Sequence, residues 1–306
     1  MNNTLLLGNG INRNIYPDAK SWQDLFKDAK DFDVDNCTFL YEACLLNSKD
    51  TDNEFKDKLV KELKEKIRPE KINKSKIKCV DTFGMLLQKH HINNLITTNV
   101  DTGIESILTV ENGYAKNGSN PNPETVYSIR RKKSFTNGKH ELNLWKIHGD
   151  VKSIASVSLG FDQYCGSLAK IESYVKGKYD RTSVKCKTSM ELKIKNKTFD
   201  NVSWIELFFN TNVYIACFGL AFSEIDLWWI LNKRCRLKKK GVPIKNKIYY
   251  LYSEYDTGEK LSGKEGKIKQ NEFEQKKNML ERFDVKLIKI QSNEELINNI
   301  FNQIKT

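Results

Sequence analysis

Short apolar runs that end in polar or glycine-containing turns recur along the chain, and a stretch with helical spacing follows most of them. Short, nearly continuous apolar runs are typical of strands that are buried on both faces of a parallel sheet. The pattern predicts six such strands, at residues 5–7, 94–101, 142–147, 213–218, 248–252 and 285–290. Their alternation with helices predicts an α/β fold, with a Rossmann-like, mostly parallel sheet and helices on both faces.

Capping signals and apolar spacing predict the helices. Ser21, three residues before Asp24, is expected to cap a short helix, and Ser292 is expected to cap the last helix together with Glu295. Five apolar residues would share the buried face of that last helix: Leu296, Ile297, Ile300, Phe301 and Ile304. Other helices are expected within residues 38–67, 80–90, 102–108, 226–231 and 267–283.

Two segments interrupt the alternation. Residues 111–140 are rich in Asn, Gly and Pro, which predicts a long excursion with a short strand at 125–129. Residues 161–212 have helical spacing apart from a Lys-rich interruption at 181–197, which we interpret as a surface loop or a small inserted subdomain. We therefore expect a single domain over residues 1–306, with a small, mainly helical insertion and inserted segments near 30–90 and 161–212.

Polar residues gather where four of the expected strands end. These ends lie at residues 8–13, 98–101, 148–150 and 219–226. Ligands of open parallel sheets bind at the carboxyl ends of the strands, near the point where the strand order reverses. We therefore expect the four strand ends to converge on one cleft.

The first of these ends contains two glycines, Gly8 and Gly10, directly after an apolar run. Such a turn can present backbone N–H groups to a phosphate, although the same pattern also occurs in purely structural turns. The usual dinucleotide fingerprint is incomplete, because Arg13 stands where its third glycine belongs. A nucleotide bound here would not be held in the manner of ordinary dehydrogenases.

Each of the other strand ends allows two interpretations. His148 could face a ligand as a general base, or it could be a buried histidine that closes a strand. Asn99 and Asp101 could bind a ligand, or they could form a turn and cap the next helix. Asp226 could likewise belong to a capping box with Ser223.

Composition is that of a water-soluble globular protein, with 39% hydrophobic and 29% charged residues. No apolar run reaches the roughly 18 residues of a membrane span, and no signal peptide is recognisable, so we expect a cytoplasmic protein.

Cysteine occurs seven times without a C-x-x-C pair, which predicts reduced, buried thiols and no zinc ribbon. These cysteines are Cys37, Cys44, Cys79, Cys165, Cys186, Cys217 and Cys235.

The formal net charge of +12 could attract nucleic acid or an acidic partner. However, lysines alternate with acidic residues along most of the chain, as on solvated helix faces. The densest basic segments, residues 185–197 and 234–240, have no interleaved aromatic residues that could stack on bases. We therefore expect a solvated basic surface, with nucleic acid reached only through a partner.

Taken together and in order, these motifs carry a family resemblance. Gly8 to Asn12, Ser21-Trp22, Thr97 to Asp101, Lys146 to Gly149 and Gly219 to Asp226 resemble the sirtuin-like NAD-hydrolase domain of bacterial antiphage defence proteins. The resemblance runs from residue 4 to about residue 255. Its Gly-Asn-Gly opening also resembles AbiH-type abortive-infection proteins.

The resemblance implies an NAD glycohydrolase that releases nicotinamide and ADP-ribose and so depletes cellular NAD. Asn99 would position a water molecule near the nicotinamide ribose, Asp101 would support that region, and His148 would act as a base towards a ribose hydroxyl. NAD would be the substrate, and no metal would be required. The residues implied in NAD binding are Gly8, Asn9, Gly10, Ile11, Asn12, Thr98, Gly219, Ser223 and Asp226.

Two departures from deacylating sirtuins favour hydrolysis of free NAD. The segment after His148 lacks their four-cysteine zinc module, and Tyr16 to Ala19 replaces their Pro-Asp-Phe-Arg tetrapeptide. A module that senses NAD or ADP-ribose without turnover and a sirtuin-type deacylase are the alternatives. An effector that harms its host must be silent at rest, so we expect a homo-oligomer, a separate sensor or ATPase protein of the same system, or both.

Overall fold

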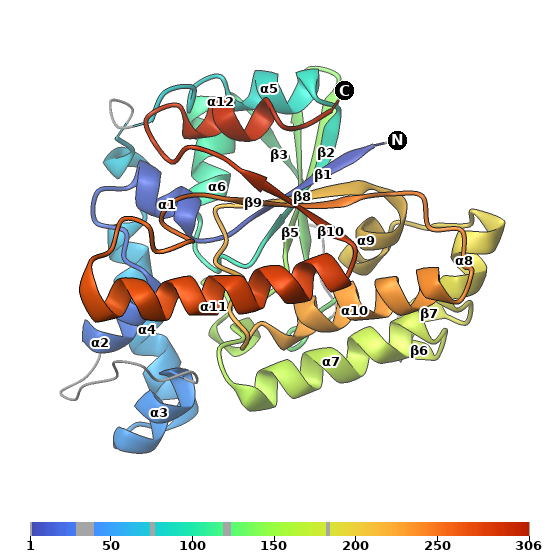
Figure 1. Cartoon of the computed structure of the whole chain (residues 1–306), viewed down its shortest axis with the longest axis horizontal. Coiled ribbons are helices and arrows are strands. Elements are labelled where there is room, and N and C mark those ends of the chain that lie inside the picture. The colour runs from blue at the N-terminus through green and yellow to red at the C-terminus, as the bar shows by residue number, and fades with distance from the viewer. Residues whose placement is uncertain (1, 29–39, 74–76, 119–123, 182–183, 306) are drawn as a thin grey trace.

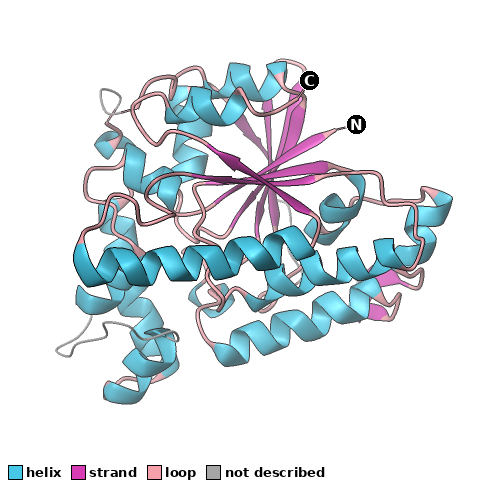
Figure 2. Cartoon of the chain, viewed as in Figure 1, coloured by secondary structure: helices cyan, strands magenta, loops and turns pink. Residues whose placement is uncertain are grey.

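The computed structural model describes residues 2–28, 40–73, 77–118, 124–181 and 184–305 (Figure 1). Strands converge in the middle of the molecule and helices lie on either side of them (Figure 2). The main sheet contains β1 (Asn3–Leu7), β2 (Ile92–Thr97), β3 (Ala115–Asn117), β4 (Lys132–Asn137), β5 (His140–Lys146), β8 (Asn212–Ala216), β9 (Ile248–Tyr252) and β10 (Val285–Lys289). A separate hairpin is formed by β6 (Tyr179–Arg181) and β7 (Val184–Cys186).

The order across the main sheet is β10-β9-β8-β1-β2-β5-β4-β3. The first six of these strands pair in parallel, and β4 and β3 extend the sheet in antiparallel fashion. Numbered along the chain, the parallel strands follow the 3-2-1-4-5-6 order of dinucleotide-binding folds. The predicted Rossmann-like α/β class is confirmed, and the strand order reverses between β1 and β8.

Pairing register brings the strand ends to one level. Leu7, at the end of β1, pairs with Thr97 of β2 on one side and with Ala216 of β8 on the other. Thr97 pairs in turn with Lys146 of β5. The turns that follow these four strands therefore leave the same edge of the sheet.

Helices cover both faces of the sheet (Figure 1). On one face lie α5 (Phe83–Lys89), α6 (Gly103–Ser106) with the π-helical segment η2 (Ile107–Glu111), and α12 (Leu296–Phe301). The opposite face carries α7 (Phe161–Val175), α10 (Ile225–Lys239) and α11 (Gly263–Arg282). The other helical segments are α1 (Gly10–Ile15), α2 (Trp22–Asp28), α3 (Leu40–Asn47), α4 (Asp52–Lys66), η1 (Pro69–Lys71), η3 (Ile154–Ser156), α8 (Met190–Asn196), η4 (Trp204–Glu206) and α9 (Leu207–Asn210).

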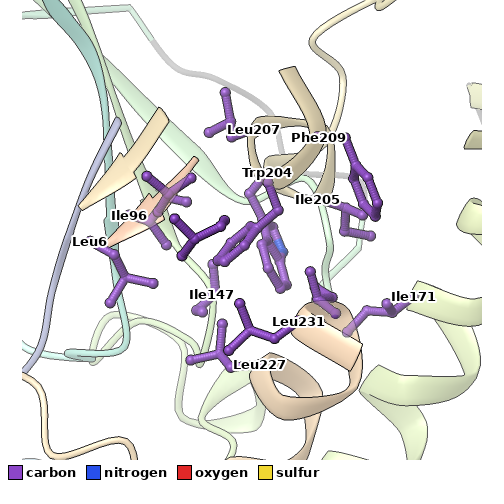
Figure 3. Close-up of a cluster of buried hydrophobic side chains, with 14 of the residues drawn as sticks. Leu6, Ile96, Ile147, Ile171, Trp204, Ile205, Leu207, Phe209, Leu227 and Leu231 are labelled. Carbon is purple, nitrogen blue, oxygen red and sulfur yellow. The ribbon is translucent and has the colours of Figure 1, made fainter. Parts of the chain in front are cut away.

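The largest hydrophobic cluster lies between the sheet and α7, α10, η4 and α9 (Figure 3). Strand residues Leu6 and Ile96 face Leu227 and Leu231 of α10 across Trp204. All of these side chains are at most 2% exposed. The first two turns of α10 pack into this core through Leu227 and Leu231. The polar residues at the start of α10 are therefore held against the carboxyl edge of the sheet.

A third cluster connects the inserted helices to that edge. Phe55, Leu59 and Leu63 of α4 belong to one buried cluster with Val100, which follows β2, and Val151, which follows β5. The insertion α2 to α4 therefore packs over the turns that leave β2 and β5. We call these three helices the cover.

Several local predictions are confirmed. Asp24 N donates a hydrogen bond of 3.1 Å to Ser21 Oγ, so Ser21 caps α2. Pro69 follows the end of α4 and begins η1. The five apolar residues predicted to share one face in the last segment of the chain are all buried.

Two predicted elements are wrong. Residues 125–129 do not form a strand, because Tyr127 has a φ of 54°, which a strand cannot contain. The strand is β4, and it forms a hairpin with β5 through Gly138, whose φ of 58° suits a tight turn. Ser292 does not cap the last helix, which begins at Leu296. Just before it, the side chain of Asn293 accepts a hydrogen bond of 3.0 Å from the N–H of Glu295.

The Lys-rich interruption at 181–197 contains the β6–β7 hairpin and α8 in place of a simple surface loop. Lys193 is buried, with Nζ 2.6 Å from Glu206 Oε1 and 2.7 Å from Asp200 Oδ2. Arg234 is also buried, and it donates to the backbone carbonyl of Asn246. The prediction of fully solvated basic segments is therefore wrong at these two positions.

Three of the cysteines, Cys44, Cys186 and Cys235, are buried as predicted. Cys79 and Cys217 are partly exposed and Cys165 is exposed, so the prediction is wrong for Cys165; Cys37 lies outside the described residues. No disulfide joins the six cysteines that the structure describes. Across the described ranges, no helix is both long and apolar enough to cross a membrane.

Replacing Leu231 tests the core of Figure 3. Leu231→Ala removes buried methyl groups at a position that is 1% exposed, so we expect it to lower the free energy of unfolding by about 2–5 kcal/mol. The matched control is Leu192→Ala on α8, where the leucine is 49% exposed and a change below about 0.5 kcal/mol is expected. Urea denaturation of both variants measures the difference, and equal losses would contradict the described packing.

Candidate functional site

The turn after β1 packs directly against the turn after β8. Gly8 N donates to the carbonyl of Ala216 at 3.3 Å, and Gly10 N donates to the carbonyl of Cys217 at 2.8 Å. A Cβ atom on either glycine would lie 2.7–2.8 Å from the Cys217 carbonyl oxygen, closer than real Cβ contacts. The two glycines are required for this backbone contact, and their N–H groups are already bonded rather than presented to a phosphate.

Asn99 lies where β2 ends beside β1. The hydroxyl of Thr97 donates to the carbonyl of Leu7 at 2.8 Å and accepts from Asn99 N at 3.0 Å. Asn99 Nδ2 donates to the carbonyl of Gly8 at 3.3 Å. Asn99 is 2% exposed, and within the described part of the chain its Oδ1 atom is buried with no hydrogen-bond partner. A buried acceptor without a partner is costly, which makes Oδ1 a candidate contact for a bound molecule.

Asp101 joins the turn after β2 to α1. Its Oδ2 accepts from Asn12 Nδ2 at 2.8 Å, and its Oδ1 accepts from Gly103 N at 2.7 Å. Asp101 therefore supports the start of α6, as one predicted interpretation held, and it also fixes Asn12. Burial raises the pKa of the Asp101 carboxyl, although the positive charge of Lys146 opposes the rise.

Lys146 was not among the predicted site residues, but it lies at the same edge of the sheet. It ends β5 with no exposed surface, and its Nζ lies 3.0 Å from Glu105 Oε1 and 3.4 Å from Asp150 Oδ2. Nζ also donates to the carbonyls of Val100, at 3.0 Å, and Asp101. A buried ammonium is tolerated only when it is paired, so this network fixes the turn after β2. The available sequence signal was a lysine between Trp145 and Ile147, at the end of a predicted strand.

His148 contacts the start of α10. Its Nε2 lies 2.9 Å from Asp226 Oδ2, and its Nδ1 lies 3.4 Å from Glu224 Oε2. The hydroxyl of Tyr164 on α7 donates to Glu224 at 3.0 Å, and the Tyr164 ring packs edge-on against His148 at 5.3 Å between centroids. Glu224 and Tyr164 were not among the predicted site residues.

Both carboxylates act on the protonation of His148. Burial disfavours the imidazolium, but the charges of Asp226 and Glu224 outweigh it and raise the pKa of His148 to about 9. Burial also raises the pKa of Glu224. At neutral pH His148 is therefore protonated, and in this conformation it donates hydrogen bonds and cannot accept a proton.

Among the residues that the structure describes, the same three form a group that could hold a metal ion. One ligand atom each of His148, Glu224 and Asp226 lies within 4.8 Å of the others. In the described conformation the two carboxylates contact opposite nitrogens of the imidazole ring. The described geometry is that of an imidazolium between two carboxylates.

Asn99 and His148 extend neighbouring strands to the same level, since each lies two residues beyond the paired residues Thr97 and Lys146. Thr98 is buried beside them. Ile11 is also buried, in the core on the α5 side of the sheet, so only its backbone could meet a ligand.

The remaining predicted residues lie around the turns. Gly219 is exposed, with no atom within 4 Å of a Cβ built on it, and Ser223 is half-buried. Asp226 is not part of a capping box with Ser223, because its oxygens contact His148 and the N–H of Leu227. Asn9, in the turn after β1, donates a hydrogen bond of 2.8 Å to the carbonyl of Lys20, which lies just before α2.

Comparison with known proteins leaves the function to be argued from this geometry. No protein-family model matches the chain, and no curated protein matches it.

The backbone contact at the glycines predicts a stability effect. Gly10→Ala would force a methyl group towards the Cys217 carbonyl, so we expect a loss of about 1–3 kcal/mol in the free energy of unfolding. Gly219→Ala is the control, because its methyl group would enter open space. Urea denaturation compares the two, and an unchanged Gly10→Ala variant would contradict the close approach of the turns.

The raised pKa of His148 predicts how stability depends on pH. A histidine that titrates near 9 when folded and near 6.5 when unfolded adds stability that is complete below pH 6.5 and disappears as the pH rises through 9. Relative to His148→Gln, the wild-type protein should lose up to roughly 3 kcal/mol between about pH 6 and about pH 10. Urea titrations of both proteins over that range measure the difference, and a constant difference would show that the imidazolium is absent.

Proposed function

We propose that this protein is an NAD glycohydrolase that cleaves the bond between nicotinamide and ribose. The observation that carries the proposal is the buried, unpartnered Oδ1 of Asn99, at the carboxyl end of the strand next to the one that carries His148. The 3-2-1-4-5-6 strand order, with glycine-dependent turns where it reverses, supports a dinucleotide as the ligand.

In the proposed reaction, Asn99 would bind the attacking water or a ribose hydroxyl. Its Oδ1 can accept a hydrogen bond, while its Nδ2 remains anchored on the Gly8 carbonyl. Fixing the nucleophile in this way removes part of the entropic barrier to attack. Asp101 would act indirectly, through Asn12 and the start of α6.

The His148 group would act through its charge. Departure of nicotinamide leaves positive charge on the ribose, and fixed negative groups stabilise such a transition state. With both carboxylates ionised, one imidazolium against two carboxylates leaves one negative charge on this group. A base towards a ribose hydroxyl, which the resemblance assigns to His148, would instead have to be Asp226 or Glu224 at neutral pH.

Chromatography of nicotinamide released from NAD tests the proposal. We expect Asn99→Ala to lower the initial rate by a factor of about 100 or more, as the loss of one preorganised hydrogen-bonding group does in other enzymes. His148→Ala should also lower the rate, because the imidazolium holds the carboxylates of Asp226 and Glu224 in place. Asn93→Ala is the control, since Asn93 lies near the other end of β2 and donates to the carbonyl of Glu141.

The assay should span protein concentrations over which light scattering detects assembly, because the resemblance implies control by self-association. A wild-type protein that releases no more nicotinamide than Asn99→Ala at any of these concentrations would refute the hydrolase.

An acetylated peptide in the same assay separates hydrolysis from deacylation. If the protein is a deacylase, nicotinamide release will depend on the peptide. An active hydrolase would suit the antiphage role that the resemblance implies.

A module that binds NAD or ADP-ribose without turnover is the second candidate. It is favoured by the protonated state of His148, which in this conformation cannot accept a proton. NAD binding that survives His148→Ala, with no product formed by the wild-type protein, would establish this function instead.

A further inference from the structure

A hollow of about 450 Å³ lies beside α7, away from the residues of the candidate site. Its wall is formed by α7, the loop before β4 and the β6 strand that runs beside α7 (Figure 1). Its lining includes Tyr127, Gly166, Lys170, Lys178, Tyr179 and Arg181. We call this hollow the α7 pocket.

Cations crowd the α7 pocket. Lys170, Lys178 and Arg181 line it. Lys170 Nζ lies 3.4 Å from Glu124 Oε1, and the acidic lining residue Asp180 is 3.2 Å from the ammonium of Lys185. Burial lowers the pKa of Lys170, and the charge of Arg181 adds to this effect while Glu124 opposes it. An anion in the pocket would relieve the repulsion among these cations.

Arg130 adds a further cation beside Tyr179, a lining residue of the α7 pocket. Its charge and that of Arg181 both reach the hydroxyl of Tyr179, which donates to the buried Glu124. Among the described residues, Arg130 Nη1 is a buried donor that has no hydrogen-bond acceptor. A buried guanidinium N–H without an acceptor is costly, and phosphate oxygens are well suited to supply one.

Tyr127 forms a rigid aromatic wall of the α7 pocket. A Cβ built on Gly166 would lie 2.6 Å from Cδ2 of Tyr127, so the ring rests directly on the backbone of α7. The φ of 54° at Tyr127 is a strained conformation for a residue with a side chain, and such strain is concentrated at functional sites. The ammonium of Lys170 lies 5.8 Å from the centre of this ring.

We propose that the α7 pocket binds a phosphate-bearing nucleotide, with its phosphates on the cations and its base against the tyrosine rings. Its volume lies in the range of small-molecule sites and is sufficient for a mononucleotide. This second site does not depend on the proposed hydrolase activity.

Equilibrium dialysis with ADP as the probe tests the α7 pocket. The double variant Lys178→Glu, Arg181→Glu reverses two charges in its lining, and we expect it to weaken ADP binding at least about tenfold. The matched control, Lys264→Glu with Lys267→Glu, makes the same change in net charge on exposed positions of α11 and should bind ADP as the wild type does. If the reversal variant is unfolded by circular dichroism, Lys178→Ala with Arg181→Ala replaces it, with a smaller loss expected.

Competition and variant measurements identify which part of ADP is bound and at which site. Pyrophosphate should compete with ADP and adenosine should compete weakly, because the phosphates supply most of the attraction. Binding that is lost in Asn99→Ala but kept in the reversal variant would place ADP at the candidate site and overturn the proposal. No ADP binding by the wild-type protein at millimolar concentration, or equal binding by adenosine, would overturn it as well.

Discussion

The close approach of two backbone turns at the centre of the sheet is the constraint on which the candidate site depends. Gly10 donates to the carbonyl of Cys217, and neither Gly8 nor Gly10 leaves room for a side chain. This contact joins β1 to β8 where the strand order reverses, so it fixes both turns at the same edge of the sheet. The start of α10 follows the second turn. Asp226 in this segment contacts His148, which follows β5 on the far side of β1 and β2.

Buried charge is the second organising feature of this edge. Lys146 is held by two carboxylates and two carbonyls, while His148 is held by two carboxylates. In both groups the loss of one partner would leave an uncompensated charge in the interior, which costs more than the pair itself contributes. The side chains around Asn99 are therefore held in place by electrostatics as well as by packing.

The sequence predicts the sheet and its polar edge because both are local patterns. Apolar runs locate the parallel strands, and the polar residues at the ends of two of these runs include Asn99 and His148. The failures come from interactions between distant residues or from backbone conformations. Glu224 and Tyr164 meet His148 only through the crossing of α10 and α7, and the positive φ of Tyr127 has no signature in a run of strand-forming residues. Lys193 looked solvated because its partners, Asp200 and Glu206, belong to a later segment.

The cover formed by α2 to α4 has a consequence for how tightly a ligand is held. Asn99 and His148 are at most 5% exposed, and the segments on which they lie are anchored to α4 through Val100 and Val151. A ligand that touches these side chains must therefore bind a more open conformation, in which segments anchored to the cover have moved. Its apparent dissociation constant equals the intrinsic constant divided by the fraction of molecules that are open. Weakening the contacts of Phe55 or Leu59 would then tighten binding without changing any residue at the site.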